Sequence, residues 1–519
     1  MRHLRLLPIA AALATPLAAQ QPAPPPPDFD AYVAKVLATF QVPGAAVAIV
    51  KDGQVVLAKG YGVKTLGDPA PVGPFTRFGI ASNTKAFTAT ALAILVERGK
   101  IEWDAPVRRY LPDFAMYEPF VTREMTVRDL LVHRSGLGLG AGDLLWWPAS
   151  TYTRAEIMHR LRYIKPATSF RSAYAYDNVL YLVAGELIEK VSGRSWEDFV
   201  ANEILAPVGM THSTVRHADA MRGGDVATTH AVVDGKVRIV PPMTSDNTNP
   251  AGGINSGAAD IARWMITQLD SGRTPDGTRL FTPRSARQLW TGVTPTPFGV
   301  PTGEFAPLRS NYSLYALGFG TRDYRGFKML NHTGGLPGYV SEILMIPDQR
   351  LGVAVLTNQE STEAFRSITL PVLDHYLGAP PHDWLAAYKK QADEAAAHLA
   401  TATTKATARD TTVRPTLPLT KYAMTYRDAW YGDVIVRSEG GRLTIRFSHT
   451  PELAGTLEHQ KGDAFIARWN DRSLRADAFV NFVVANGAVT AVRMTPTPGT
   501  DFSFDFQDLA LRPVPPKRP

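Results

Sequence analysis

Hydrophobic positions repeat with two different periods along this chain, and each period predicts a different kind of element. Apolar residues spaced three or four apart predict helices, and these cover residues 29–40, 82–97, 178–192, 258–269 and 364–377. A shorter helix is predicted over residues 125–137, ending in a turn at Gly136. Runs rich in β-branched residues between turn signals predict strands, at residues 45–51, 54–59, 328–331, 339–346 and 351–357.

The order of these elements predicts the fold class. Strands lie at both ends of the region 29–379 with helices between them, so we expect one antiparallel sheet whose terminal segments pair, flanked by helices in an α+β domain. Beyond it, short strands are predicted at residues 434–437, 443–447, 465–469, 479–484, 489–494 and 502–506, with hairpin turns at 440–441 and 486–487. This second pattern is typical of a small antiparallel barrel or meander.

The rest of the chain reads as connecting and targeting segments. Residues 1–19 combine a charged start, an apolar run and a small-residue exit, which indicates a secretory signal cleaved near Ala19 and a secreted or periplasmic protein. Residues 20–28 are a Pro-rich spacer, 380–415 an Ala-rich and then Thr-rich linker, and 514–519 a basic tail after the barrel domain of residues 416–513. No other run approaches the length of a membrane span.

Composition narrows the classes of function. The chain has 519 residues, 45% hydrophobic and 20% charged, which fits a globular protein long enough for two domains. It has no cysteine, so disulfides, thiolate metal sites and a cysteine nucleophile are excluded. The formal charge of +7 comes without a clustered basic face with interleaved aromatics, so we expect no nucleic-acid partner. We also expect no cofactor and no metal.

The first candidate for chemistry is the pair Ser82 and Lys85 at the start of the predicted helix 82–97. Residues three apart share a helix face, and the unpaired N–H groups of a helix N-terminus favour developing negative charge. A desolvated lysine is able to take the proton that makes a serine hydroxyl a poor nucleophile. A helix-capping serine with a solvated lysine would give the same short pattern.

Two further short motifs follow in order. Tyr176, Asp177 and Asn178 precede the predicted helix 178–192, and His332, Thr333 and Gly334, followed by Gly335, end a predicted strand. Each has a structural interpretation when taken alone. The first fits a half-buried aromatic with a helix cap, and the second fits a polar strand end.

Taken together, the three motifs resemble the serine β-lactamase and penicillin-binding-protein superfamily. The resemblance is strongest to its class C-like branch of DD-peptidases, D-aminopeptidases and esterases, and it covers roughly residues 29–378. Flanking segments at residues 130–137, 250–253 and 334–339 match as well. The resemblance implies a β-lactamase-like transpeptidase fold, and the C-terminal barrel resembles the lipocalin-like domain appended to some members.

The resemblance also implies a role for each motif residue. Ser82 is the acylated nucleophile, Lys85 its proton partner, and Tyr176 the general base or a member of a shared proton network. Asn178 holds the substrate amide, while His332, Thr333 and Gly334 line the strand edge against which the substrate lies. The backbone N–H groups of Ser82 and Gly335 form the oxyanion hole.

One residue departs from the family pattern, and this departure decides how we rank the expected functions. β-Lactamases of this branch usually carry lysine where this chain has His332, so we rank peptide or ester hydrolysis above β-lactam hydrolysis. The predicted function is a secreted serine hydrolase, a DD-peptidase or D-aminopeptidase. The alternatives are a β-lactamase or esterase of the same fold, and a non-catalytic penicillin-binding, peptide-binding or scaffolding protein. The expected partner is a small peptide, amide, ester or β-lactam.

Other features are left with open interpretations. His133 is interpreted as a packing histidine near the cleft, and Trp146 and Trp147 as either a mobile lip or a core anchor. The loops 138–150 and 294–310 are expected to set selectivity. The barrel domain is interpreted as a cap over the active site, a site of homo-oligomer contacts or a passive stabilising module.

Overall fold

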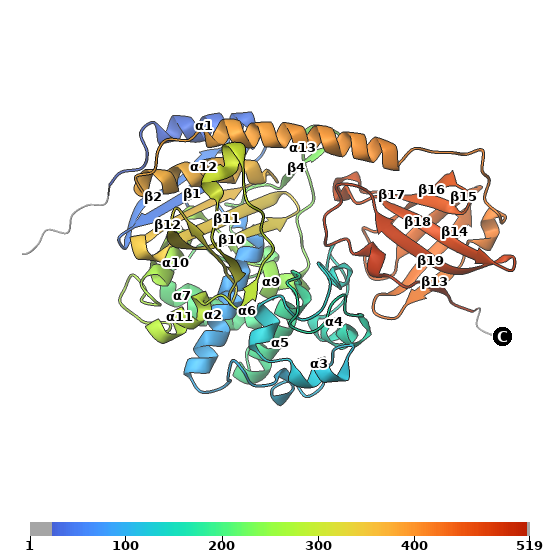
Figure 1. Ribbon diagram of the computed structural model, residues 1–519, viewed down its shortest axis with the longest axis horizontal. Coiled ribbons are helices and arrows are strands. Elements are labelled where there is room, and N and C mark those ends of the chain that lie inside the picture. Colours follow the sequence, from blue (N-terminus) through green and yellow to red (C-terminus); the bar gives the residue numbers. More distant parts are fainter. Residues whose placement is uncertain (1–22, 516–519) are drawn as a thin grey trace, which may run out of the picture.

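The computed structural model describes residues 23–515, and Figure 1 shows two bodies joined by a long helix. The predicted signal at residues 1–19 and the last four residues of the basic tail lie outside the described residues. None of the helices in the described part of the chain is long and apolar enough to cross a membrane.

The first body is built on an antiparallel sheet of eight strands in the order β2-β1-β12-β11-β10-β9-β8-β7. The strands are β1 (Gly44–Lys51), β2 (Gln54–Gly62), β7 (Thr294–Pro295), β8 (Ser313–Tyr315), β9 (Gly320–Tyr324), β10 (Phe327–Leu336), β11 (Tyr339–Ile346) and β12 (Leu351–Thr357). The N-terminal hairpin joins the C-terminal strands through β1 and β12, where Ala45 pairs with Thr357. The predicted pairing of the terminal segments is confirmed.

Both faces of this sheet are covered by other elements, and the side chains of β1 are buried on both of them. Its residues Ala46, Ala48 and Val50 belong to one core, and Ala45, Val47 and Ile49 belong to the other. Successive side chains of a strand point to opposite faces, so a strand buried on both sides reads as the continuous apolar run seen here.

Helices form the two outer layers. One face of the sheet packs α12 (Thr362–Tyr376), with α1 (Phe29–Thr39) and α13 (Trp384–Ala406) beside it, and the other packs α10 (Ala258–Leu269). Further helices pack on one another around α2 (Thr84–Glu97), whose Phe87 stacks on Trp264 of α10: α5 (Val179–Ser192), α9 (Asn249–Gly252) and α11 (Pro283–Trp290). The remaining short elements are α3 (Pro119–Glu124), α4 (Arg154–Arg160), α6 (Trp196–Val200), α7 (Ala206–Val208), α8 (His217–Arg222), and the strand pairs β3 (Phe78–Gly79) with β6 (Asn255–Ser256) and β4 (His230–Val233) with β5 (Lys236–Ile239).

The second body is a nearly closed antiparallel barrel. Its strands are β13 (Thr425–Asp428), β14 (Gly432–Glu439), β15 (Arg442–Phe447), β16 (Ala454–Lys461), β17 (Ala464–Trp469), β18 (Ala478–Ala485), β19 (Ala488–Pro496) and β20 (Arg512–Pro513). They follow the order β19-β18-β17-β16-β15-β14-β13-β20, and a bridge between Val492 and Leu511 brings the two ends together. The α+β domain with a small C-terminal β-barrel is thus confirmed.

Some predicted elements are wrong. Instead of a helix over residues 125–137 there is only a 3-10 turn, Arg128–Leu131, because His133 and Gly136 adopt left-handed backbone conformations that a helix does not allow. Residues 502–505 form a loop and Phe506 begins a 3-10 turn, so the strand predicted at 502–506 is wrong. The strand β16 was not predicted because Leu457 is its one large apolar residue.

The linker at residues 380–415 is mostly helical. The helix α13 continues through the start of the Thr-rich tract, where Thr401 and Thr404 donate hydroxyl hydrogen bonds to the carbonyl oxygens four residues earlier. This local bonding satisfies the hydroxyls without leaving the helix. The helix crosses from the sheet domain to the barrel (Figure 1).

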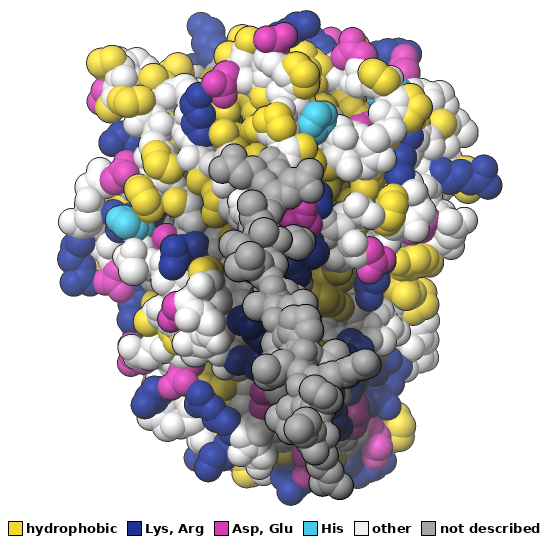
Figure 2. Space-filling model, turned by 90° about the vertical axis from the view of Figure 1, so that its left-hand side faces the viewer, with side chains coloured by type: hydrophobic (Ala, Val, Ile, Leu, Met, Phe, Trp, Pro, Cys, Tyr) yellow, Lys and Arg dark blue, Asp and Glu magenta, His cyan; other side chains and the backbone are white. Residues whose placement is uncertain are grey.

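The surface gives no sign of a single charged patch on the face that is visible in Figure 2. On that face, lysine and arginine side chains are interspersed with acidic and hydrophobic ones.

Candidate active site

Ser82 lies in a 3-10 turn, Ala81–Asn83, immediately before α2. Ser341 of β11 holds this turn. Its hydroxyl donates to the Ile80 carbonyl oxygen at 2.8 Å and accepts from the side-chain Nδ2 of Asn83 at 2.8 Å. A Cβ atom at Gly334 would stand 2.3 Å from the same Ile80 oxygen. Glycine on β10 therefore allows the strand to pack directly on the turn that carries Ser82.

Lys85 lies in the first turn of α2 and its side chain is completely buried. Its Nζ lies 3.0 Å from Ser82 Oγ, 2.7 Å from Asn178 Oδ1 and 3.1 Å from the Ala251 carbonyl oxygen. Burial lowers the pKa of Lys85 to about 7, against the attraction of Asp143 and Asp177. A large fraction of this amine is therefore neutral near pH 7 and able to accept the proton of Ser82.

Tyr176 stands beside both groups. Its ring centre lies 4.8 Å from Lys85 Nζ, and burial raises its pKa well above the usual value, an effect that the Ser82 hydroxyl partly offsets. The phenol is therefore protonated at neutral pH. This arrangement favours Lys85 as the resting base, with Tyr176 passing a proton in concert rather than starting as a phenolate.

Asn178 precedes α5 and uses both ends of its carboxamide within the protein. Its Oδ1 accepts from Lys85, and its Nδ2 donates to Asp143 Oδ2 at 2.8 Å. The side-chain amide thereby orients the Lys85 amino group. The substrate-holding role of Asn178 stays a prediction.

His332 lies in β10 together with Thr333, Gly334 and Gly335. Its Nδ1 donates to the Thr333 carbonyl oxygen at 2.6 Å, so Nε2 accepts from the Tyr315 hydroxyl at 2.7 Å. Burial, with the nearby Lys85, lowers the pKa of His332 to about 3. The imidazole is therefore neutral, and it adds no positive charge to the site.

Three residues of this network did not stand out in the sequence: Asp143, Asp177 and Tyr315. Asp143 and Asp177 are buried carboxyls whose pKa burial raises to about 7. Tyr315 comes from β8, a three-residue strand with no motif around it. Asp177 alone carried a signal, since it stands inside the Tyr176 to Asn178 motif.

His133 packs against this cluster as the sequence suggested. Its ring centre lies 4.2 Å from that of Tyr176 and 4.4 Å from that of Tyr315. Its Nδ1 accepts from the Asp177 backbone N–H at 3.2 Å, and burial lowers its pKa well below the usual value. A neutral histidine in this position supports the ring of Tyr176.

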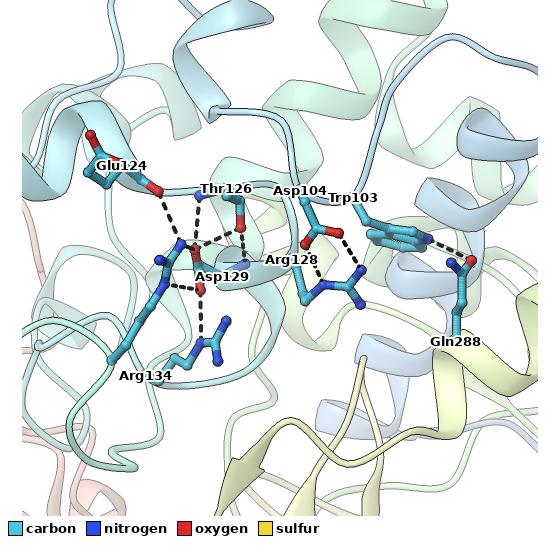
Figure 3. Close-up of polar contacts among 9 residues, drawn as sticks. Trp103, Asp104, Glu124, Thr126, Arg128, Asp129, Arg134 and Gln288 are labelled. Carbon is cyan, nitrogen blue, oxygen red and sulfur yellow. Dashed lines mark hydrogen bonds and ion pairs between the residues drawn. The ribbon is translucent and has the colours of Figure 1, made fainter.

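An ion-pair cluster centred on Asp129 holds the loop that leads to His133. Figure 3 shows Asp129 with Thr126 and Arg134. The buried carboxylate of Asp129 accepts from Thr126 and from the guanidinium groups of Arg134 and Arg171. These bonds hold the pKa of Asp129 below its usual value against the opposing effect of burial. The carboxylate therefore stays charged and ties down both sides of the His133 turn.

A cavity of about 1180 Å³ connects the site to the surface, and both bodies line it. Ser82, Tyr176 and Asn178 line it, together with residues 331–336 of β10. Trp146 and Trp147 line it as buried side chains, and Trp146 Nε1 donates to Asp143 at 2.9 Å, so Trp146 is anchored in the core. The barrel contributes residues 498–499 and 501–504, so it borders the site.

Comparison with known proteins identifies this constellation. Residues 29–377 match the beta-lactamase family, and residues 408–513 match a domain of unknown function, DUF3471. The chain belongs to the beta-lactamase family. It is a serine hydrolase, and the motifs around Ser82, Tyr176 and His332 lie within the matched region.

Two curated relatives of this beta-lactamase family protein are fungal hydrolases. Unguisins hydrolase ungD of Aspergillus violaceofuscus (strain CBS 115571) is 29% identical over 474 residues, 85% of this chain and 82% of the relative. Unguisins hydrolase ungD' of Aspergillus campestris (strain IBT 28561) is 31% identical over 425 residues, 77% of this chain and 75% of the relative.

Solved structures share the fold at lower identity. The octameric penicillin-binding protein homologue from Pyrococcus abyssi has a TM-score of 0.58 and 23% identity, over 90% of this chain and 97% of that chain. SurE with D-Leu has a TM-score of 0.54 and 19% identity, over 94% and 98%. A class C β-lactamase from Rhodobacter sphaeroides has a TM-score of 0.53 and 22% identity, over 67% and 99%. The first two matches extend over both domains.

Proposed function

We propose that this serine hydrolase is a secreted peptidase that forms an acyl-enzyme at Ser82 with peptides or amides containing D-amino acids. The observation that carries the proposal is the completely buried Lys85 amine, 3.0 Å from Ser82 Oγ, whose pKa burial lowers to about 7. Such an amine serves as a base at physiological pH, which a solvated lysine does not.

The proposed reaction has two halves. Ser82 Oγ attacks the carbonyl carbon as its proton passes to Lys85, directly or through Tyr176, and the N–H groups of Ser82 and Gly335 stabilise the oxyanion. The C–N bond then breaks, and the leaving amine takes the proton. A water molecule, deprotonated by the same pair, hydrolyses the ester, releases the acid and restores the Ser82 hydroxyl.

Two observations favour peptide substrates over β-lactams. The neutral His332 brings no charge to the strand on which β-lactamases of this branch usually carry lysine. The matching fold of a protein solved with D-Leu supports an amino-acid-derived substrate. The two fungal relatives are hydrolases by name, of compounds called unguisins.

The test is covalent labelling followed by a substrate panel. Mass spectrometry after a fluorophosphonate should show one adduct, on Ser82, that is absent from Ser82→Ala. D-amino-acid amides and D-Ala-D-Ala peptides should then turn over faster than short acyl esters or nitrocefin. No adduct on Ser82 in the wild-type protein would overturn the proposal and would favour the binding or scaffolding alternative.

A β-lactamase activity is the second candidate, and the family match itself favours it. Nitrocefin turnover faster than that of every peptide in the panel would establish it. A stable penicillin adduct without turnover would instead indicate a penicillin-binding peptidase.

The proposal also covers compartment and assembly. N-terminal sequencing of the exported protein should start near residue 20, as the predicted signal requires. Light scattering should show a homo-oligomer, in line with the octameric Pyrococcus abyssi homologue. An uncleaved N-terminus would contradict the first expectation, and a monomer the second.

A further inference from the structure

An aspartic acid side chain of the C-terminal domain is inserted into the hydrolase domain beside the active site. Asp505 lies in the loop between β19 and β20, and its side chain is completely buried. Its two oxygens accept from the backbone N–H groups of Gly142, at 2.7 Å, and Leu144, at 3.0 Å. Burial, with the nearby Asp143, raises the pKa of Asp505 well above its usual value, and the two backbone N–H bonds only partly offset this rise. The turn at Gly142 and Leu144 takes the polar partners of these two N–H groups from the barrel domain.

The residue between those two N–H groups is Asp143, which reaches the catalytic cluster. Its Oδ2 accepts from Asn178 Nδ2 at 2.8 Å, and its Oδ1 accepts from Trp146 Nε1 at 2.9 Å. Asn178 Oδ1 in turn accepts from Lys85 Nζ at 2.7 Å. A continuous chain of buried polar contacts therefore links the C-terminal domain to the lysine beside Ser82.

Resting on the proposed acylation at Ser82, we propose that Asp505 is a positioning residue: the C-terminal domain holds Asp143 in place and thereby sets the orientation and the charge environment of Lys85. Asp505 does not touch the reacting atoms. It acts by fixing the turn on which Asp143 stands, so that the barrel completes the active site rather than only covering it.

The groups that face Lys85 determine the direction of the expected effect. They are Asp143 from the loop before α4, Tyr176 and Asp177 before α5, Tyr181 of α5, His332 of β10, and His133. Both histidines are neutral, because burial lowers their pKa values. The two carboxyls are the groups that raise the pKa of Lys85.

Moving or neutralising Asp143 therefore makes the ammonium form of Lys85 less stable. The neutral amine then forms at lower pH, so the acid limb of the pH profile of acylation should move to lower pH. A purely structural contact between the domains would lower the amount of folded protein without moving that limb.

The experiment measures fluorophosphonate labelling of Ser82 against pH in the full-length chain, with thermal melting in parallel. Asp505→Ala removes both acceptor oxygens. Asp505→Asn keeps the size of the side chain but places its NH₂ group against the backbone N–H of Gly142 or Leu144. We expect each to slow labelling by ~2- to 30-fold, the usual range for residues coupled to a site without touching the ligand, and to shift the acid limb to lower pH.

Two further variants separate the explanations. Asp143→Asn should shift the limb in the same direction, and its combination with Asp505→Ala should add less than the sum of the two effects, because both act through one carboxylate. Glu439→Gln removes an exposed carboxylate at the end of β14 in the same domain and should behave as wild type.

The outcomes distinguish the two proposals. If the wild-type protein is labelled and a folded Asp505→Ala or Asp505→Asn variant is labelled at the same rate with the same pH profile, the positioning role is overturned. Additive effects in the double variant would also overturn it. Unlabelled wild type would instead overturn the acylation at Ser82.

Discussion

At the scale of single residues, the site depends on one lysine that the fold removes from water. Lys85 exchanges solvent for three acceptors, Ser82, Asn178 and the Ala251 carbonyl, within a core that excludes water. A pKa near 7 results from that desolvation, and the nearby carboxyls limit the fall. The same side chain on the helix surface would be a permanent cation.

Removing the Lys85 amine should abolish acylation while leaving the fold intact. We expect Lys85→Ala to slow fluorophosphonate labelling of Ser82 by at least ~100-fold, the usual contribution of a positioned acid or base. Its melting temperature should stay close to that of wild type, since the helix keeps a strong helix former. Lys100→Ala, an exposed lysine just beyond the end of α2, is the control. Labelling of Lys85→Ala at the full rate would refute the assigned role.

The pH dependence of acylation follows from the same residue. The base must be neutral, so kcat/KM should fall about tenfold per pH unit below a midpoint near 7, where Lys85 becomes protonated. Asp143 and Asp177 also have pKa values raised to about 7, so the midpoint belongs to the coupled cluster. A profile measured from pH 5 to 9 checks this, and a flat acid limb over that range would contradict it.

At the scale of elements, the geometry of the site comes from β10 packing against the turn that carries Ser82. Gly334 makes this approach feasible, and the Ser341 hydroxyl joins the two segments through Ile80 and Asn83. Ser82, the proposed nucleophile, and the strand edge proposed for the substrate are thereby held at a fixed separation.

A methyl group at Gly334 should disturb that separation. In Gly334→Ala the new Cβ would stand 2.3 Å from the Ile80 carbonyl oxygen, so we expect a loss of ~1–3 kcal/mol in the free energy of unfolding and slower labelling of Ser82. A Cβ at the adjacent Gly335 would meet no atom within 4 Å, so Gly335→Ala should unfold like wild type. Equal stability of the two variants in denaturant titrations would contradict the packing argument.

At the scale of the whole molecule, the two domains share a buried interface as well as a helix. Tyr152 stacks on His449 with ring centres 4.0 Å apart, and its hydroxyl donates to the Tyr431 carbonyl oxygen. Arg160 donates to the Trp430 carbonyl oxygen at 2.8 Å. With Asp505, these contacts couple the barrel to the loops that surround the active-site cavity.

The coupling predicts one unfolding transition for the full chain. Tyr152→Ala should remove ~3 kcal/mol of packing at the interface and separate the unfolding of the two domains in calorimetry. Tyr163→Ala, at an exposed tyrosine of the same domain, should leave a single transition. Two transitions in the wild-type protein would show that the domains unfold independently.

Local patterns in the sequence were sufficient to predict much of the fold. The two-sided apolar run of β1, the boundaries of α10 and the Asn-Gly hairpin before β19 each depend on neighbours a few residues apart, so periodicity and turn chemistry predicted them. Ser82, Lys85 and Tyr176 stood out because their spacing along the chain matches a family pattern. The helix predicted over residues 125–137 was wrong, because His133 has a left-handed backbone conformation and bonds to the N–H groups of Ala175 and Asp177 from a distant part of the chain.

The tertiary structure alone decided which groups complete the site. Asp505 accepts a hydrogen bond from the backbone N–H of Gly142, which is 363 positions away in the sequence. Tyr315, in a strand of only three residues, contacts His332. Such contacts leave no periodic trace in the sequence, because burial and partner are properties of the packed chain and not of a segment. For the same reason the sequence determined which residues are able to react, whereas the fold determined that Lys85 loses its water and that Asp505 of the barrel meets the turn that carries Asp143.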